Sequence, residues 1–113
     1  MKRLSTLLFL AAFGVFASCQ YKKDLPVTED CSGTVSFSQD VEPIIENNCA
    51  IAGCHNATSV NKGGPFTSFS LIKNKALTIK QQVVAGIMPQ TGSLNAAQIK
   101  TIRCWVDSGA PDN

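Results

Sequence analysis

Five cysteines stand in a chain of only 113 residues, and this density constrains the possible folds more than any other feature. The length allows one small domain and excludes two. A domain of this size buries roughly two-thirds of the surface that its unfolded chain exposes, so its core alone gives little stability. A disulfide, a metal ion or a cofactor often supplies the rest. The cysteines therefore indicate how this chain is stabilised.

The first cysteine follows a segment with the composition of a leader. Lys2 and Arg3 supply positive charge, residues 4–16 are almost entirely apolar, and two small residues then precede Cys19. This arrangement predicts a secretory signal peptide over residues 1–18, which is too short for a convincing membrane span.

The residues at the predicted cleavage site indicate lipidation. Phe16-Ala17-Ser18-Cys19 resembles a bacterial lipobox, in which cleavage leaves the cysteine as a lipidated first residue, although Phe16 stands where Leu is usual. Several acyl chains on Cys19 would anchor the protein stably, whereas a single chain binds a membrane only marginally. We therefore expect a protein on the periplasmic side of the bacterial cell envelope, lipid-anchored to the inner or outer membrane. The alternative is an ordinary signal peptide cut nearby, with Cys19 left as a free thiol.

Residues 19–30 show neither helical nor strand periodicity, and we interpret them as the lipidated N-terminus and a polar tether. The folded domain then spans residues 31–113. The whole chain has ten Lys and Arg against eight Asp and Glu, and the predicted leader removes two of the ten, leaving eight of each sign. A mature chain without net charge has no electrostatic basis for binding nucleic acid.

The start of the domain predicts a helix that leads into a second cysteine. Alternation at Val35 and Phe37 indicates a short extended segment. Asp40 is a suitable N-cap for the following helix, which places Ile45 on its apolar face and runs directly into Cys49. Further along, residues 56–68 predict a loop, and residues 71–77 and 79–85 predict two short helices, the second ended by a glycine.

The last helix has the clearest signals. Asn95 is a good N-cap, and Gln98 at the third helical position completes a capping box. Leu94 and Ile99 occupy the two positions of a hydrophobic staple, and Gly109 provides a C-terminal stop. The sequence therefore predicts a mostly helical domain with long loops.

Residues 49–55 read Cys-Ala-Ile-Ala-Gly-Cys-His and carry the most specific chemical signal. Cys-x-x-Cys-His is the attachment signature of c-type haem, in which two thiols add to the vinyl groups and the adjacent histidine ligates the iron. In this chain four residues, not two, separate Cys49 from Cys54, but the Cys54-His55 pair is intact. The pattern predicts one covalently attached haem c, with His55 as the proximal ligand.

Haem iron then requires a sixth ligand, and Met88 is the strongest candidate. Without the leader, the chain contains a single histidine and a single methionine. Gly86, Pro89 and Gly92 surround Met88 and predict a rigid loop that holds the thioether over the iron. Ligation by His and Met is typical of electron-transfer cytochromes, and it leaves no open position for substrate. We therefore do not expect an enzyme. Packing into a core is the alternative role for a lone methionine.

Three further segments complete a family pattern around these residues. They read Ser-Phe-Ser-Gln-Asp-Val-Glu-Pro-Ile-Ile (36–45), Gly-Ile-Met-Pro-Gln-Thr-Gly (86–92) and Cys-Trp-Val-Asp-Ser-Gly-Ala (104–110). Together they resemble the small single-haem class I cytochrome c domains of bacterial envelope lipoproteins, over residues 35–111. The resemblance implies the cytochrome c fold, with short helices and long loops wrapped around one covalently attached haem.

The resemblance also implies roles for individual residues. Cys49 and Cys54 would form the haem thioethers, His55 would be the proximal iron ligand and Met88 the distal one. Trp105 would be the aromatic residue of the last helix that packs toward the haem. The implied function is a membrane-tethered one-electron carrier with redox protein partners in the envelope.

Two cysteines remain after one is assigned to lipid and two to haem. Cys31 and Cys104 could pair in an oxidising envelope, and a bridge over about 74 residues would stabilise by roughly 4 kcal/mol in the chain-entropy model. The alternative is two unpaired thiols, with Cys104 simply buried.

Two other functions compete with the electron carrier. Cys49, Cys54, His55 and Cys104 could form a Cys₃His zinc site, although adjacent Cys and His residues rarely bind one tetrahedral ion without strain. A haem-sensing lipoprotein would result if Met88 did not ligate the iron. Four lysines lie in the middle segment, and we interpret them as an ordinary solvated face: Lys62, Lys73, Lys75 and Lys80. The alternative hypothesis is that they ring an exposed haem edge and attract an acidic partner.

Overall fold

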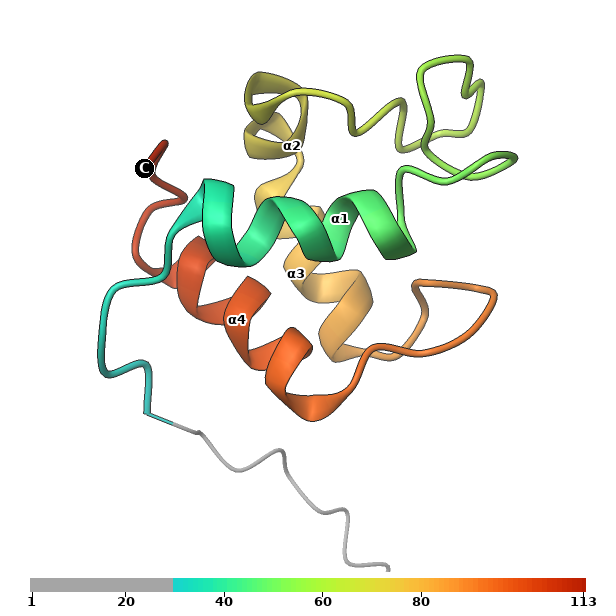
Figure 1. Cartoon of the computed structure of the whole chain (residues 1–113). Helices are drawn as coiled ribbons and strands as arrows, with labels where there is room; N and C mark the ends of the chain where they lie inside the picture. The colour runs from blue at the N-terminus through green and yellow to red at the C-terminus, as the bar shows by residue number, and fades with distance from the viewer. Residues whose placement is uncertain (1–29) are drawn as a thin grey trace, which may run out of the picture.

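The computed structural model describes residues 30–113, which fold into five consecutive helical segments and contain no strand within that range (Figure 1). The expectation of a mostly helical domain with long loops is confirmed. The predicted leader 1–18, the lipidation site Cys19 and the tether as far as residue 29 lie outside the described residues. No helix in the described part is both long and apolar enough to cross a membrane.

The domain begins with a π-helical turn that the sequence did not predict. The η1 segment, Phe37–Val41, continues directly into α1, Glu42–Asn48. The hydroxyl of Ser36 accepts a hydrogen bond from the backbone N–H of Gln39 and so forms the N-cap. Asp40 instead accepts from the Ser36 backbone N–H at 2.8 Å. The predicted cap at Asp40 and the extended conformation at Phe37 are therefore wrong, because the helix starts one turn earlier.

The middle of the chain forms two short helices that meet at a break. The α2 helix is Phe69–Asn74 and the α3 helix is Ala76–Val84, so each begins two or three residues before its predicted start. Lys75 separates them with a non-helical backbone. The preceding residues 56–68 form turns and loop, as predicted.

The last helix, α4, is Ala96–Asp107. Asn95 accepts from the Gln98 backbone N–H at 2.9 Å, and the Gln98 side chain accepts from the Asn95 backbone N–H at 3.0 Å. This confirms the capping box. Beyond α4, Gly109 adopts a φ of 99° and begins the turn that ends the helix.

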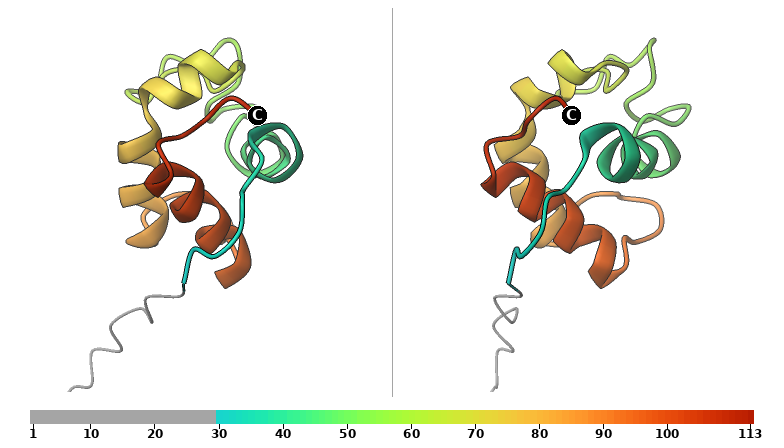
Figure 2. Two further views of the ribbon diagram at one scale, coloured as in Figure 1. Left: turned by 90° about the vertical axis from the view of Figure 1, so that its left-hand side faces the viewer. Right: turned by 60° about the vertical axis from the view of Figure 1, so that its left-hand side comes forward.

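The core lies where η1 and α1 meet α4, and α2 and α3 complete the same cluster with Ile72, Ile79 and Val83, as α3 packs against α4 (Figure 2). Trp105 is completely buried, with its ring 5.5 Å from that of Phe37 and its indole N–H donating to the Pro111 carbonyl at 2.9 Å. Val41, Ile45 and Ile102 are also completely buried, and the whole core cluster is apolar. The last described residues return to the start of η1.

Hydrogen bonds to both polar atoms of the Asn113 side chain fix this return of the chain. Its side-chain oxygen accepts from the Phe37 backbone N–H at 2.8 Å, and its amide donates to the Val35 carbonyl at 3.2 Å. A disulfide joins Cys31 to Cys104 nearby, with their Cα atoms 5.3 Å apart. The segment before η1 is thus tied to α4 covalently, in the pairing that the cysteine count favoured.

Candidate functional site

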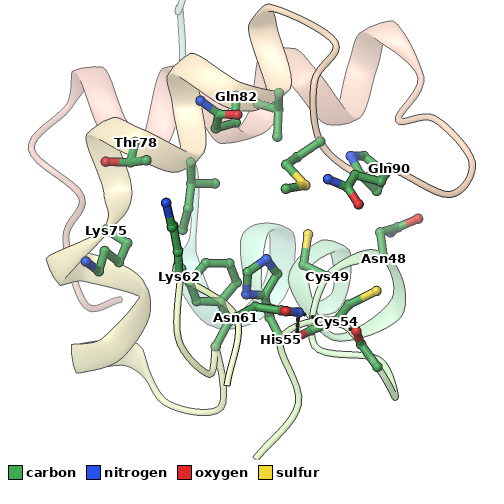
Figure 3. Close-up of a pocket in the computed structure, with 17 residues that line it drawn as sticks. Asn48, Cys49, Cys54, His55, Asn61, Lys62, Lys75, Thr78, Gln82 and Gln90 are labelled. Carbon is green, nitrogen blue, oxygen red and sulfur yellow. Dashed lines mark hydrogen bonds between the residues drawn. The ribbon is translucent and has the colours of Figure 1, made fainter. Parts of the chain in front are cut away.

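A cavity of about 620 Å³ lies between the loop that follows α1 and the face of α3 (Figure 3). Its size is within the range of small-molecule and cofactor sites. Cys49, Cys54, His55 and Met88 all line it, although they come from two separate parts of the chain. The remaining walls are largely apolar and include Phe66, Ile79 and Val83. The structure therefore brings together the four residues that the sequence singled out as cofactor ligands.

Cys49 is positioned by the end of α1. Its backbone N–H donates to the Ile45 carbonyl at 2.8 Å, so the last helical turn fixes the residue, and its sulfur points into the cavity in Figure 3. The side chain is buried. Burial, with the nearby Cys54 as the smaller cause, raises the pKa of the Cys49 thiol to about 11 from an ordinary 9.0. The thiol is consequently neutral and of low reactivity toward oxidants.

The four residues after Cys49 form a compact loop, and the chain then returns to the cavity. The Cys54 backbone N–H donates to the Ile51 carbonyl at 3.1 Å, and Gly53 adopts a φ of 80°. The His55 backbone N–H then donates to the carbonyl of Cys49 at 2.9 Å. This last bond closes the loop, so the longer spacer still brings Cys54 and His55 back beside the end of α1.

The imidazole of His55 is held in one orientation. Its Nδ1 lies 2.7 Å from the Gly64 carbonyl oxygen. Since a carbonyl only accepts, Nδ1 carries a proton, so in the neutral imidazole the lone pair resides on Nε2. The ring also stacks on Phe66, with centroids 4.2 Å apart and planes 20° apart. A histidine that ligates a metal through Nε2 typically donates its other ring N–H in this way.

Gly63 leaves room for the imidazole. A Cβ atom built on Gly63 would lie 2.6 Å from Cε1 of His55, closer than real Cβ contacts. The sequence predicted only a loop over residues 56–68 and did not show which side chain Gly63 would face. Phe66 was likewise missed. No spacing rule links either residue to His55; only the fold brings them together.

Met88 follows the end of α3, where a turn at Gly86 sets the direction of the chain. Gly86 has a φ of 67°, its N–H donates to the Val83 carbonyl at 3.2 Å, and the Ile87 N–H donates to the Gln82 carbonyl at 2.9 Å. These two bonds form a Schellman motif at the end of α3. Met88 itself is half-buried, and a cis peptide bond links it to Pro89. The loop therefore brings Met88 to the cavity from a part of the chain separate from the Cys-His segment.

The four lysines of the middle segment divide into two pairs. Lys62 and Lys75 line the cavity, and neither forms an ion pair with a carboxylate in the described part of the chain. Lys80 pairs with Asp107, and Lys73 donates to the carbonyls that follow α4. Of the four lysines, only Lys62 and Lys75 therefore lie at the cavity.

Two further expectations are corrected by the geometry. Trp105 is not among the residues from 30 to 113 that line the cavity; it packs against Phe37 in the core instead. Cys104 is engaged in the disulfide and is not available to a Cys₃His zinc site. Within the described range, no three His, Cys, Asp or Glu side chains are grouped to hold a metal ion.

Comparison of the chain with protein-family models, with curated proteins and with solved structures finds no match. Function is therefore inferred from the residues of the site themselves.

Proposed function

We propose that this protein is a membrane-tethered single-haem c-type cytochrome that carries one electron at a time in the bacterial cell envelope. The convergence of Cys49, Cys54, His55 and Met88 on one largely apolar cavity supports this proposal most directly. Two thiols, an imidazole and a thioether are the groups that covalent attachment and six-coordinate ligation of haem require.

Each residue of the set has a distinct task. Cys49 and Cys54 would hold the haem through thioether bonds, and His55 would present Nε2 to the iron because its Nδ1 proton is donated to Gly64. Met88 would be the sixth ligand from the other side. A bound haem supplies an iron centre that exchanges a single electron. Because His55 and Met88 would both ligate the iron, no position would be left for a substrate, and we propose a carrier, not an enzyme.

The polarity of the cavity is consistent with this ligand. Ile79, Val83 and Phe66 supply apolar surface for a flat, apolar ring system and would exclude water from the iron. Lys62 and Lys75 supply positive charge suited to the two carboxylates of haem. A dry site with Met ligation favours the reduced iron and so raises the reduction potential.

The order of the elements also supports the cytochrome c fold. A first helix leads into the Cys-His segment, a methionine loop follows α3, and α4 packs against η1 at the start of the domain. The resemblance of residues 35–111 implies the same order. The proposed location rests on residues 1–19 of the sequence, which predict export and lipidation.

Haem staining of a denaturing gel tests the proposal. The full chain, exported in a host that matures c-type cytochromes, should give a stained band that survives boiling in detergent. The Cys49→Ala/Cys54→Ala variant should lose the stain. The Cys31→Ala/Cys104→Ala variant is a matched control that also removes two cysteines but keeps those at the cavity, and its folded fraction should stain normally. A folded but unstained wild-type protein would refute the proposal.

Carbon monoxide separates the carrier from a haem sensor. With Met88 on the iron, the spectrum of the reduced, stained protein should remain unchanged on mixing with the gas. Rapid, tight binding would indicate an open sixth position and would contradict the carrier function. The Met88→Ala variant is the positive control, because it removes the proposed ligand and should bind the gas.

A further inference from the structure

Asn61 lies outside the proposed ligand set, yet its side chain is tied to the Cys-His segment. The Asn61 amide nitrogen donates to the Cys54 carbonyl at 2.7 Å and lies 3.3 Å from the Gly53 carbonyl. An amide NH₂ has two donors, so one side chain can serve both acceptors. Figure 3 shows Asn61 directly beside Cys54. These contacts fix the peptide between the second cysteine and the histidine.

The backbone of Asn61 connects this anchor to the imidazole. Its carbonyl accepts from the Gly64 N–H at 2.7 Å, which closes a four-residue turn. The carbonyl of Gly64 in turn accepts the Nδ1 proton of His55 at 2.7 Å. Asn61 therefore stands at the junction of two contacts: its side chain holds Cys54, and its turn holds the acceptor that orients His55.

The four-residue spacer explains why such an anchor is needed. The carbonyls of Gly53 and Cys54 lie in turns, outside any helix or sheet that would satisfy them. The Ser59 hydroxyl also donates to the Cys54 carbonyl, and it accepts from the Asn61 backbone N–H at 3.2 Å. Asn61 is the residue that joins these bonds to the turn beneath the imidazole. Without its amide, the turn would be linked to the Cys-His segment through Ser59, the contact between His55 and Gly64, and the Phe66 N–H, which donates to the His55 carbonyl at 2.8 Å.

We infer that Asn61 is a positioning residue for His55: its side-chain amide fixes the turn whose carbonyl selects the Nδ1-protonated tautomer and directs Nε2 into the cavity. The contacts themselves are those of the described structure. The role as a support for an iron ligand rests on the proposed function.

The tautomer of His55 can be read directly, because the chain contains a single histidine. The full chain is produced with ¹⁵N-labelled histidine in a host without c-type maturation and kept haem-free. Long-range ¹H–¹⁵N correlation spectra in alkaline buffer distinguish protonation at Nδ1 from protonation at Nε2. We expect the Nδ1 form in the wild type and a mixture of both tautomers in Asn61→Ala. An unchanged tautomer in folded Asn61→Ala would overturn the inference.

Two further variants separate positioning from general loop stability. Thr58 donates to the Asn56 side chain in the same loop but contacts neither Cys54 nor His55, so Thr58→Ala should keep the wild-type tautomer. Asn61→Gln retains the amide and should restore part of the Nδ1 form. If Thr58→Ala gave the same mixture of His55 tautomers as Asn61→Ala, the effect would belong to the loop in general and the inference would be overturned. Failure of Asn61→Gln to restore any of the Nδ1 form would have the same meaning.

The matured protein gives an independent readout, which also applies where a haem-free variant does not fold. A weaker Nδ1–H donation makes the imidazole a poorer electron donor, so the reduction potential of Asn61→Ala should rise above that of the wild type. Equal potentials in Asn61→Ala and wild type would count against the role. An absence of covalent haem from the wild type would refute the proposed function alone, because the haem-free tautomer measurement does not depend on it.

Discussion

The two sides of this small domain are held together by different forces. On one side, η1, α1 and α4 bury Phe37, Ile45 and Trp105 in a continuous apolar core, with a disulfide beside it. On the other side, the segments 50–67 and 85–92 are held mainly by turns and by hydrogen bonds from short side chains. Of the proposed ligands, only Cys49 belongs to the core. The proposed ligands other than Cys49 therefore lie outside the core, although Phe66, Ile79 and Val83 belong both to the core cluster and to the cavity wall.

This separation predicts that core substitutions unfold the protein, whereas site substitutions change ligand geometry with little loss of stability. Five experiments test it, beginning with the largest expected change in the free energy of unfolding.

Replacing Trp105 should have the largest effect. Trp105→Ala removes a completely buried side chain and its hydrogen bond to Pro111, and should lower the free energy of unfolding by about 5 kcal/mol. Urea denaturation followed by far-ultraviolet circular dichroism measures the loss. Were the variant nearly as stable as the wild type, the core would not be the main source of stability.

Removing the disulfide should cost somewhat less. The bridge joins residues 73 positions apart, and the Cys31→Ser/Cys104→Ser variant should lose about 4 kcal/mol in the chain-entropy model. The same denaturation experiment, with the wild type in reducing buffer as a second sample, gives the value. Free thiols at both positions in purified, unreduced wild type would contradict the structure.

Raising the pH should weaken the haem-free protein through Cys49. Because folding raises the pKa of this thiol to about 11 from 9.0, the folded state retains the proton longer than the unfolded chain. Its contribution is full below pH 9 and is lost as the pH rises toward about 11, a decrease of about 2 kcal/mol. Cys49→Ala lacks this titration. When the free energies of unfolding of the wild type and of this variant are plotted against pH, the two curves should therefore converge between pH 9 and about 11. Parallel curves would show that the thiol is not buried as described.

Removing the cap of α4 should have a modest effect. Asn95→Ala loses the hydrogen bond to the Gln98 N–H, which should cost about 1 kcal/mol. Thermal unfolding of this variant can be compared with that of Ala97→Ser, a neighbouring exposed substitution that leaves the capping box intact. Equal midpoints for the two variants would contradict a stabilising role for the cap.

The smallest change in stability should come from Gly63→Ala, although its effect at the site should be large. The added methyl displaces the His55 ring, which the open cavity can accommodate at a cost of about 0.5 kcal/mol. In the matured protein the same displacement should reduce the yield of covalent haem, measured as stain per unit of protein. A large loss of stability with a normal haem yield would reverse the proposed separation of the two sides.

The sequence predicted the elements whose signals are local. The Asn95 capping box and the glycine after α3 are complete within a few residues, and the structure contains both. The start of the first helix was misplaced because Asp40 and Ser36 are both good caps. Only the Ser36 hydroxyl reaches a free N–H of the first turn, whereas the Asp40 carboxylate turns back to the Ser36 backbone.

The residues of the site that bear reactive or ligating groups could be predicted from their residue types. Cys49, Cys54, His55 and Met88 follow from a motif and from counting the remaining ligands, and all four line the cavity. The supporting residues were not predictable. Asn61 and Gly63 act through contacts across a loop, and the role expected for Trp105 failed because α4 turns that side chain toward Phe37.

The disulfide has a mechanical consequence for a chain that is pulled from its N-terminal side. Tension that arrives at Cys31 divides between the backbone and the covalent link to Cys104 in α4. The link carries load directly to the most deeply packed helix, so the η1 turn is shielded from peeling away residue by residue. A domain pulled through its N-terminal segment would thus transmit the load to α4 and be pulled as a whole.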